Sequence, residues 1–446
     1  MSKILKSCVI FFLALFLNAS IFALNVNFTD PTTTPGGTPD LSTTSGADPQ
    51  VTPNNSGRYV YAIWNFAPAI QVAISSDFGV TWTDPTTTPA GTPDLATSGS
   101  SAQITTDSSG RYVYAIWHKG IDIQVAISSD FGVTWTDPIT TPAGTPDLSA
   151  NGQDPQITID STGRYVYAIW NVPAGGAVQL AISSDFGRTW TSRPDLAAAG
   201  SNTQIITDNT GKYVYAVWDD FLGTGVVQVS ISSDFGVTWT SRPDLAAAGV
   251  APQITTDSTG RYVYAVWYDS GTGKVQVSIS SDFGVTWTSR PDLVSSGSQF
   301  PQITTDSTGR YVYAIWGGTV QVAISSDFGV TWINPTTTPA GTPDLAASSG
   351  TNAHIKTDSS GRYIYAIWRL NTGKIQVAIS TDFGLNWTNP ITTPAGTPDL
   401  VASGLVPQII TDSTGRHVYP VWSSGRIQTA NGFKTFFPIQ NINIQN

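Results

Sequence analysis

The octapeptide Ser75-Ser76-Asp77-Phe78-Gly79-Val80-Thr81-Trp82 recurs along this chain and sets its organisation. Its seven full copies carry their aspartates at Asp77, Asp130, Asp185, Asp234, Asp282, Asp327 and Asp382. The copies differ little: Arg188 replaces the valine in one, and Thr381 replaces the second serine in another. Each copy belongs to a longer unit of about 50 residues with strand-like composition, and such a period is typical of β-propellers.

A second landmark, Arg-Tyr-Val-Tyr-Ala-Ile-Trp or a close variant, precedes each octapeptide. It ends in eight tryptophans, which are Trp64, Trp117, Trp170, Trp218, Trp267, Trp316, Trp368 and Trp422. The sequence therefore predicts an all-β fold, a single propeller of eight four-stranded blades. Seven blades with one unpaired unit is the alternative.

The octapeptide resembles the Asp box (S/T-x-D-x-G-x-x-W/F) of the BNR repeats in the sialidase-like β-propeller superfamily. The resemblance covers nearly the whole chain after its leader, and implies that the box is the turn between the third and fourth strands of a blade. The residues themselves favour a structural role for all seven aspartates. Asp77 can accept backbone N–H groups within its own turn, and Gly79 suits a positive φ. Trp82 is expected to fill the space between neighbouring blades.

One unit, residues 103–147, shows the expected strand order. The predicted strands cover 103–106, 111–117 and 123–128, and the fourth begins at Thr134. Alternation places Tyr112, Tyr114 and Ile116 on one face of the second strand and Val113, Ala115 and Trp117 on the other. We expect each blade to carry its own small core.

The two ends of the chain complement each other. Residues 28–35 match residues 82–89, so the chain begins at a fourth strand. The eighth unit has a degenerate box, with Asn431, Thr435 and Phe436 at the positions of Asp, Thr and Trp. Pairing of residues 25–30 with the last blade is therefore expected to close the ring and remove its free sheet edges.

The N-terminus has the features of a secretory leader. Residues 1–23 combine Lys3 and Lys6 with an apolar run and a small residue, Ala23, at the expected cleavage site. Cleavage there removes Cys8, the only cysteine, and leaves residues 24–446 as one propeller domain without disulfides. We expect a protein that is secreted, periplasmic or at the cell surface. No other apolar run is long enough to span a membrane.

The charge balance narrows the choice of partners. The net charge is −10, and all 31 acidic residues are aspartate. This charge argues against nucleic acid and anionic membranes as partners. A sialidase pairs its tyrosine nucleophile with a glutamate, so a chain without glutamate is not expected to be a sialidase.

The fourth-strand segment occurs in a long Thr/Pro/Gly-rich form and a short form. The short form, Thr-Ser-Arg-Pro-Asp-Leu, supplies Arg193, Arg242 and Arg290 in three consecutive units. Equivalent positions in successive blades point in rotationally related directions, which does not suit a convergent clamp on one anion. Ion pairs with nearby aspartates are the expected role.

The loops that follow the second-strand tryptophans vary most between units, and the superfamily places its active site on that face, the top face. The candidate ligand-binding residues are His118, Asp219, Asp220, Tyr268, Asp269 and Arg369. We expect a non-enzymatic protein that acts as a monomer without cofactor or metal. Its expected partner is an extracellular glycan or a protein surface. Binding at repeated pockets between blades is a further alternative.

The competing hypothesis is a glycoside hydrolase. It needs two carboxyl groups at a set separation. Asp219 or Asp220 with Asp269, beside Tyr268, are the candidates, since they occur in consecutive units. Solvated loop aspartates are the simpler interpretation of the same residues.

Overall fold

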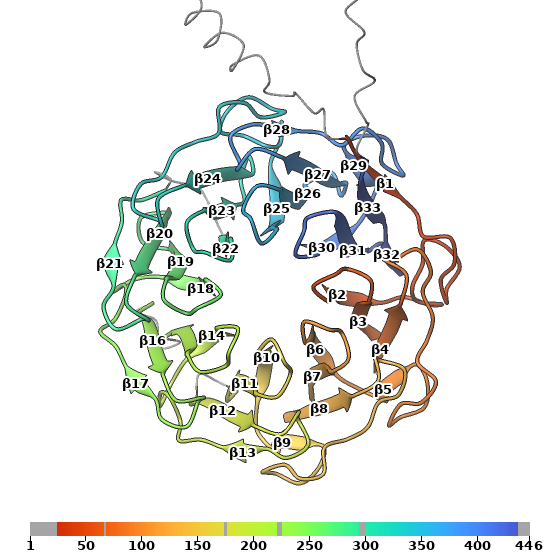
Figure 1. Cartoon of the computed structure of the whole chain (residues 1–446), viewed down its shortest axis with the longest axis vertical. Helices are drawn as coiled ribbons and strands as arrows, with labels where there is room; N and C mark the ends of the chain where they lie inside the picture. Colours follow the sequence, from red (N-terminus) through yellow and green to blue (C-terminus); the bar gives the residue numbers. More distant parts are fainter. Residues whose placement is uncertain (1–24, 67, 174–175, 221–224, 294–299, 436–446) are drawn as a thin grey trace, which may run out of the picture.

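The computed structural model describes residues 25–66, 68–173, 176–220, 225–293 and 300–435. Its strands form eight antiparallel sheets arranged radially around one axis, as Figure 1 shows. The described ranges contain no helix, and hence none that could cross a membrane. The eight-bladed propeller predicted from the repeats is confirmed. The proposed leader, residues 1–23, lies outside the described residues.

The strands nearest the axis and their neighbours follow the repeat. The first strands are β2 (Ala47–Pro53), β6 (Ser100–Thr106), β10 (Gln153–Ile159), β14 (Ser201–Thr207), β18 (Val250–Thr256), β22 (Gln302–Thr305), β25 (Gly350–Thr357) and β30 (Leu405–Thr411). The second strands are β3 (Val60–Phe66), β7 (Val113–Lys119), β11 (Val166–Asn171), β15 (Val214–Asp219), β19 (Val263–Asp269), β23 (Val312–Trp316), β26 (Ile364–Leu370) and β31 (His417–Ser423).

The outer strands are less regular. The third strands are β4 (Ala69–Ser75), β8 (Asp122–Ser128), β12 (Val178–Ser183), β16 (Val227–Ser232), β20 (Lys274–Ser280), β24 (Gln321–Ser325) and β27 (Ile375–Ser380), with β32 (Ile427–Thr429) and β33 (Asn431–Thr435) in the last blade. The fourth strands are β5 (Asp94–Ala96), β9 (Asp147–Ser149), β13 (Thr191–Ser192), β17 (Thr240–Ser241), β21 (Thr288–Ser289), β28 (Trp387–Thr388) with β29 (Asp399–Val401), and β1 (Asn25–Thr29). In the sixth blade the fourth strand is reduced to bridges, including Ile333 with Ile324.

The Asp box is a self-contained hydrogen-bonded turn. Asp77 accepts the backbone N–H of Thr81 at Oδ1 (2.8 Å) and its hydroxyl at Oδ2 (2.6 Å). Ser75 Oγ donates to Asp77 Oδ1 (2.9 Å) and accepts the N–H of Gly79 (2.9 Å). Gly79 has φ +78°, as expected, and Phe78 also lies in the left-handed region. The structural role predicted for Asp77 is confirmed.

The hydrophobic core lies between blades rather than within them. Val113, Ala115 and Trp117 share a buried cluster with Tyr61 and Ile63 of the preceding blade. The opposite face of the same strand, Tyr114 and Ile116, packs with Trp170 of the following blade. The predicted alternation of faces is confirmed, but the expectation of a separate core in each blade is wrong. A single sheet layer has to bury both faces against its neighbours.

Two repeated hydrogen-bond relays join and brace the blades. The second-strand tyrosine donates across each boundary to a turn glycine, for instance from Tyr114 to Gly163 O (2.6 Å) and from Tyr419 to Gly57 O (2.6 Å). Burial raises the pKa of this buried hydroxyl in Tyr114, with lesser contributions from nearby aspartates, so it stays protonated and able to donate. Within a blade, Trp117 Nε1 donates to Gln124 Oε1 (3.1 Å), and Gln124 Nε2 donates to Asp147 Oδ1 (2.8 Å).

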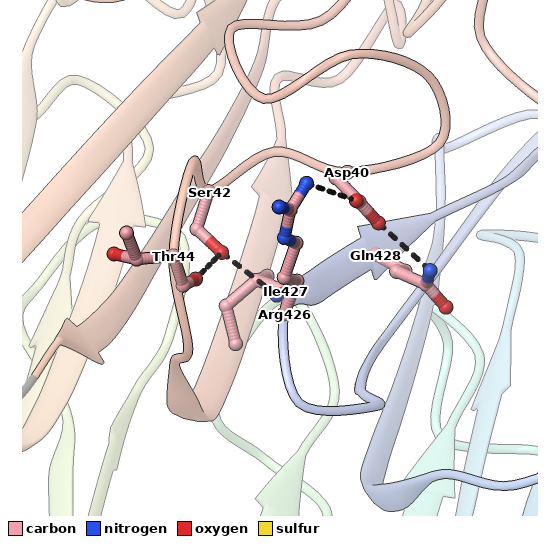
Figure 2. Close-up of polar contacts among 6 residues, drawn as sticks. All are labelled: Asp40, Ser42, Thr44, Arg426, Ile427 and Gln428. Atoms are coloured by element: carbon pink, nitrogen blue, oxygen red, sulfur yellow. Dashed lines mark hydrogen bonds and ion pairs between the residues drawn. The ribbon is translucent and has the colours of Figure 1, made fainter.

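The ring is closed by the N-terminal segment. β1 pairs antiparallel with β33 over Asn25–Thr435 to Thr29–Asn431. Further along, Asp40 accepts hydrogen bonds from Gln428 Nε2 (2.8 Å) and Arg426 (2.9 Å), and Ser42 Oγ accepts the N–H of Ile427 (3.0 Å), as Figure 2 shows. The predicted closure by residues 25–30 is therefore confirmed.

The C-terminal end differs from one expectation. Asn431 and Thr435 do not form a degenerate box; they lie in β33, which continues the third strand and pairs His417 with Phe433. The sequence here lacks the Ser and Asp side chains that hold the box turn, so the strand runs on and offers its edge to β1. Phe436 lies outside the described residues.

Candidate functional site

The end of each second strand lies on the face opposite the Asp boxes, because strands two and three are joined there. The residue after the tryptophan faces the start of the first strand, just before a β-bulge: His118 opposite Ser100, Asp219 opposite Ser201, and Tyr268 opposite Val250. The six predicted ligand-binding residues thus occupy one face of the ring. They belong to the second, fourth, fifth and seventh blades rather than to one cluster.

The first-strand bulges form a ring of residues that the sequence interpretation missed. Seven blades contribute a bulged residue with φ between 46° and 52°, namely Asp48, Ser101, Asp154, Asn202, Ala251, Asn352 and Val406. In the sixth blade Phe300, with φ 53°, takes the corresponding place just before β22. Five of these eight residues are exposed, and Phe300 has 63% of its surface accessible. The first strands surround the axis in Figure 1, so these eight positions encircle it at the top face. Bulges often change the direction of a side chain next to functional sites.

A signal for the bulge was present in the sequence. Two variable residues stand between a glycine and the first-strand glutamine region, as in Gly99-Ser100-Ser101-Ala102-Gln103. Reading the first strand as 103–106 left out its variable start. The glycine and the glutamine region recur in most repeats of this chain, whereas the two residues after the glycine vary; these two are the bulge residue and its neighbour.

The carboxylate of Asp219 is buried and fully engaged. Its side chain accepts hydrogen bonds from Ser201 Oγ (2.5 Å), Asn202 Nδ2 (2.8 Å) and the backbone N–H of Ala251 (2.9 Å) in the next blade. Only 2% of the residue is exposed. Asp219 therefore holds two neighbouring bulges in position.

Asp269 also acts within its own loop. It ends β19, and its Oδ1 accepts the backbone N–H groups of Gly271 (2.9 Å) and Thr272 (3.1 Å). Its residue exposure is 8%. This arrangement is an Asx-type turn that caps the β19–β20 hairpin. Tyr268, just before it, is half-buried.

The three other candidates differ in their contacts: two make a side-chain hydrogen bond and one lines a pocket. His118 Nε2 shares a hydrogen with Ser100 Oγ (2.7 Å), which ties it to the strand that carries the bulge. Arg369 Nε donates to Gly404 O (2.9 Å) at the entrance to the last blade. Asp220 lines a pocket of about 350 Å³ together with Trp218, Gln228 and Arg242.

The three repeated arginines do not form the expected ion pairs. The ion pairs within the described ranges are Lys274–Asp292, Lys374–Asp399 and Arg426–Asp40. The Pro-Asp-Leu aspartates that could have paired with Arg193, Arg242 and Arg290 instead accept hydrogen bonds from the third-strand glutamines. The prediction of ion pairs for these arginines is wrong.

Among the described residues, no group of three or more His, Cys, Asp or Glu side chains is placed to hold a metal ion.

His354 gives the ring an acid-sensitive position. It replaces the first-strand glutamine in β25, and burial lowers its pKa to about 3, assisted by Lys356 and opposed by a hydrogen bond to Ile409. Between about pH 6.5 and 3 the unfolded chain therefore binds a proton that the folded chain does not, so the free energy of unfolding falls as the pH falls.

We expect His354→Gln to remove this pH-dependent loss of stability. Glutamine should fit, because Gln408 occupies the equivalent position of β30 in the next blade. Wild-type protein should lose on the order of 1 kcal/mol more stability than the variant between pH 7 and 4.5. Thermal melting of both proteins across this range measures the difference. Parallel curves would show that His354 does not titrate as a buried base.

The comparisons with known proteins found similar solved structures but no related sequence. No protein-family model matches the sequence, and no curated protein matches it. Similar solved structures include a GH74 xyloglucanase from Xanthomonas campestris, 13% identical over 85% of this chain and 66% of that one, with TM-score 0.44. A prolyl endopeptidase structure is 10% identical over 85% of this chain and 54% of that one, with TM-score 0.48. A Hadza microbial sialidase is 15% identical over 84% and 73%, with TM-score 0.41.

The chain spans less than two thirds of the length of the first two of these structures. TM-scores below 0.5 at such low identity carry no argument about family or activity. Membership of the Asp-box repeat family stays a prediction that rests on the octapeptide and its hydrogen bonds.

Proposed function

We propose that the chain is a secreted, non-enzymatic recognition protein that binds an extracellular glycan with its top face. The observation that carries the proposal is the ring of residues with left-handed backbone at or just before the first strands. One left-handed residue per blade differs in chemistry from its neighbours, while the strands that present it hardly vary. A rigid scaffold with variable surface positions is the usual division between structure and binding.

The chemistry of the ring suits sugar hydroxyls. Asp48, Asp154, Asn202 and Asn352 offer carboxylate and amide groups, and all four are exposed. Phe300 adds an exposed aromatic face. Ligand pockets commonly combine such apolar surfaces with a few placed polar groups. A protein surface is the alternative partner for the same face.

The residues that follow the second-strand tryptophans, among them the predicted candidate Asp219, hold members of this ring in position. Asn65 Nδ2 donates to Asp48 Oδ2 (3.1 Å), and Asp219 holds Asn202 and the backbone of Ala251. In this proposal Asp219 and His118 position the binding residues, while Tyr268 and Arg369 extend the surface. The hydrolase hypothesis is weaker because both oxygens of Asp219, and Oδ1 of Asp269, already accept hydrogen bonds from their own surroundings.

The proposal predicts one dominant binding site per ring. A glycan array with the secreted protein should identify a ligand, and Phe300→Ser combined with Asp154→Ala should weaken its binding at least about tenfold, as expected when an aromatic contact and a hydrogen bond are both lost. Tyr268→Ala should weaken glycan binding less than the double variant does. Asp269→Ala tests whether the cap of the β19–β20 hairpin matters for binding. Melting temperatures should not change, because both substituted side chains of the double variant are exposed.

Ile333→Ser is the matched control, since Ile333 is exposed on another surface of the ring. Several equivalent sites per ring, or binding that ignores the Phe300 and Asp154 substitutions, would contradict the top-face assignment. Turnover of a glycan that disappears in Asp269→Asn would favour the hydrolase instead.

A further inference from the structure

The long fourth-strand segments have a structural role at the next blade. Each of the first four lays a Thr-rich stretch beside the following Asp box as a parallel bridge: Thr33 with Thr81, Thr87 with Thr134, Thr140 with Thr189, and Thr337 with Asn386. A fifth segment pairs Thr392 with Asn27 of β1. Each of these segments therefore forms an additional edge strand on the blade that follows it in the sequence.

Two backbone hydrogen bonds hold each stretch. In the second blade, Thr86 donates its N–H to Val133 O (2.8 Å), and Trp135 donates its N–H to Thr87 O (2.9 Å). The same pair of bonds joins Thr32 and Thr33 to Val80 and Trp82 in the first blade. The proline before each stretch, such as Pro85, is buried against the ring.

The presence of a long segment beside the Asp box decides whether the tryptophan of that box is buried. Trp82, Trp135, Trp190 and Trp387 follow long segments, and their exposure is between 1% and 5%. Trp239, Trp287 and Trp332 follow the three short segments and are only half-buried. The adjoining valines follow the same pattern, because Val237, Val285 and Val330 are 47–49% exposed while Val80 and Val133 are 38–39% exposed.

The three uncovered positions share a set of free backbone groups, and at two of them, Trp287 and Trp332, there is also a groove. Among the described residues, no hydrogen bond reaches the N–H of Trp239, Trp287 or Trp332, nor the carbonyl oxygen of Val237, Val285 or Val330. A groove of about 290 Å³ lies at Trp332, lined by Pro291, Leu293 and Val330. Its equivalent at Trp287, about 270 Å³, is lined by Pro243, Leu245 and Val285.

We propose that these three consecutive uncovered edges, at Trp239, Trp287 and Trp332, bind an extended Thr- and Pro-rich peptide of another protein by β-addition. The ring shows the complementary ligand itself, since Pro-Thr-Thr-Thr-Pro fills the equivalent groove at Trp82 and Trp135. Each ligand offers one N–H to the valine carbonyl and one carbonyl to the tryptophan N–H, and its proline covers the indole. Backbone pairing with side-chain pockets is a general mode of peptide recognition.

The ligand comes from a different protein rather than from a second copy. All five long segments of a folded ring are already hydrogen-bonded to the following blade of the same ring and cannot reach another ring without being released. The site lies beside the Asp boxes, so it is separate from the top-face ring and independent of the function proposed for that ring.

The test uses a labelled peptide with the sequence of residues 84–95 and the full secreted chain. Fluorescence anisotropy and titration calorimetry, to about 1 mM peptide, should show three equivalent sites per ring. A peptide N-methylated at the threonine equivalent to Thr86 should bind about tenfold more weakly, because it loses the donor to the valine carbonyl and gains a clash. A scrambled peptide should not bind.

Two exchange variants give matched controls. Replacing residues 240–245 with the sequence of residues 83–95 should fill the groove at Trp287 and reduce the stoichiometry to two. The reverse exchange, with the sequence of 240–245 in place of 83–95, should uncover Trp135 and raise it to four. Phe300→Ser should change neither value, which distinguishes this site from the top face.

Absence of binding at about 1 mM, which corresponds to roughly 4 kcal/mol of binding free energy, would overturn the proposal. The proposal would also be overturned if both exchange variants still bound three peptides per ring. A neutral oligosaccharide that binds wild-type protein and loses one site in the filled variant would show that the grooves bind sugars instead of peptides.

Discussion

Removal of residues 24–45 should destabilise the whole ring far more than deletion of a surface loop. Val26, Phe28 and Leu41 are each at most 2% exposed and leave the core together. At about 1.5–3 kcal/mol for each buried apolar side chain, their loss alone is worth roughly 5–9 kcal/mol before relaxation. The edge of β33 also loses its partner and becomes a site for aggregation.

Differential scanning calorimetry of the truncated chain measures this effect, with deletion of the hairpin tip 270–272 as the loop control. Arg426→Ala is a second control, because it removes only an exposed ion pair that is expected to contribute less than about 1 kcal/mol. A synthetic peptide of residues 24–45 should restore stability when it is added to the truncated protein. Equal melting of the truncated and loop-deleted proteins would refute closure by the N-terminal segment.

Substitution of a covered box tryptophan should be the most damaging single change. Trp135 is 1% exposed and packs with Tyr61, Ile63 and Trp117 across a blade boundary. Its Nε1 also donates to Gly132 O (2.9 Å). Trp135→Ala is expected to reduce the free energy of unfolding by about 3–5 kcal/mol, the range for a large aromatic core residue.

Trp287→Ala provides the matched comparison, since Trp287 has the same box and the same hydrogen bond, to Gly284 O (3.0 Å), but only a partial cover. It should cost less than half as much, because less surface is returned to water. Denaturant unfolding, followed by hydrogen exchange at the blade boundary, measures both. Equal losses would mean that the long segments add nothing to the burial of the box.

The candidate site was predictable only in part. The sequence located the variable face through loops that follow invariant tryptophans, and His118, Tyr268 and Arg369 do lie at that end of the strands. It could not show that Asp219 and Asp269 are buried hydrogen-bond acceptors. Their hydrogen-bond donors, such as the N–H of Ala251, lie in another blade or in a turn. Residue types alone do not specify the backbone conformation that brings these donors to the carboxylates.

Sequence alone determined the strand order, the number of blades, the Asp-box turn and the closure of the ring. Each of these depends on short-range signals, such as Asp77 and Gly79 within one turn or the match between residues 28–35 and 82–89, and repetition made them unambiguous. Tertiary structure decided what depends on contacts between units. It set the left-handed bulges around the axis, placed the core between blades, and left three box tryptophans uncovered where the preceding segment is too short to reach the next blade.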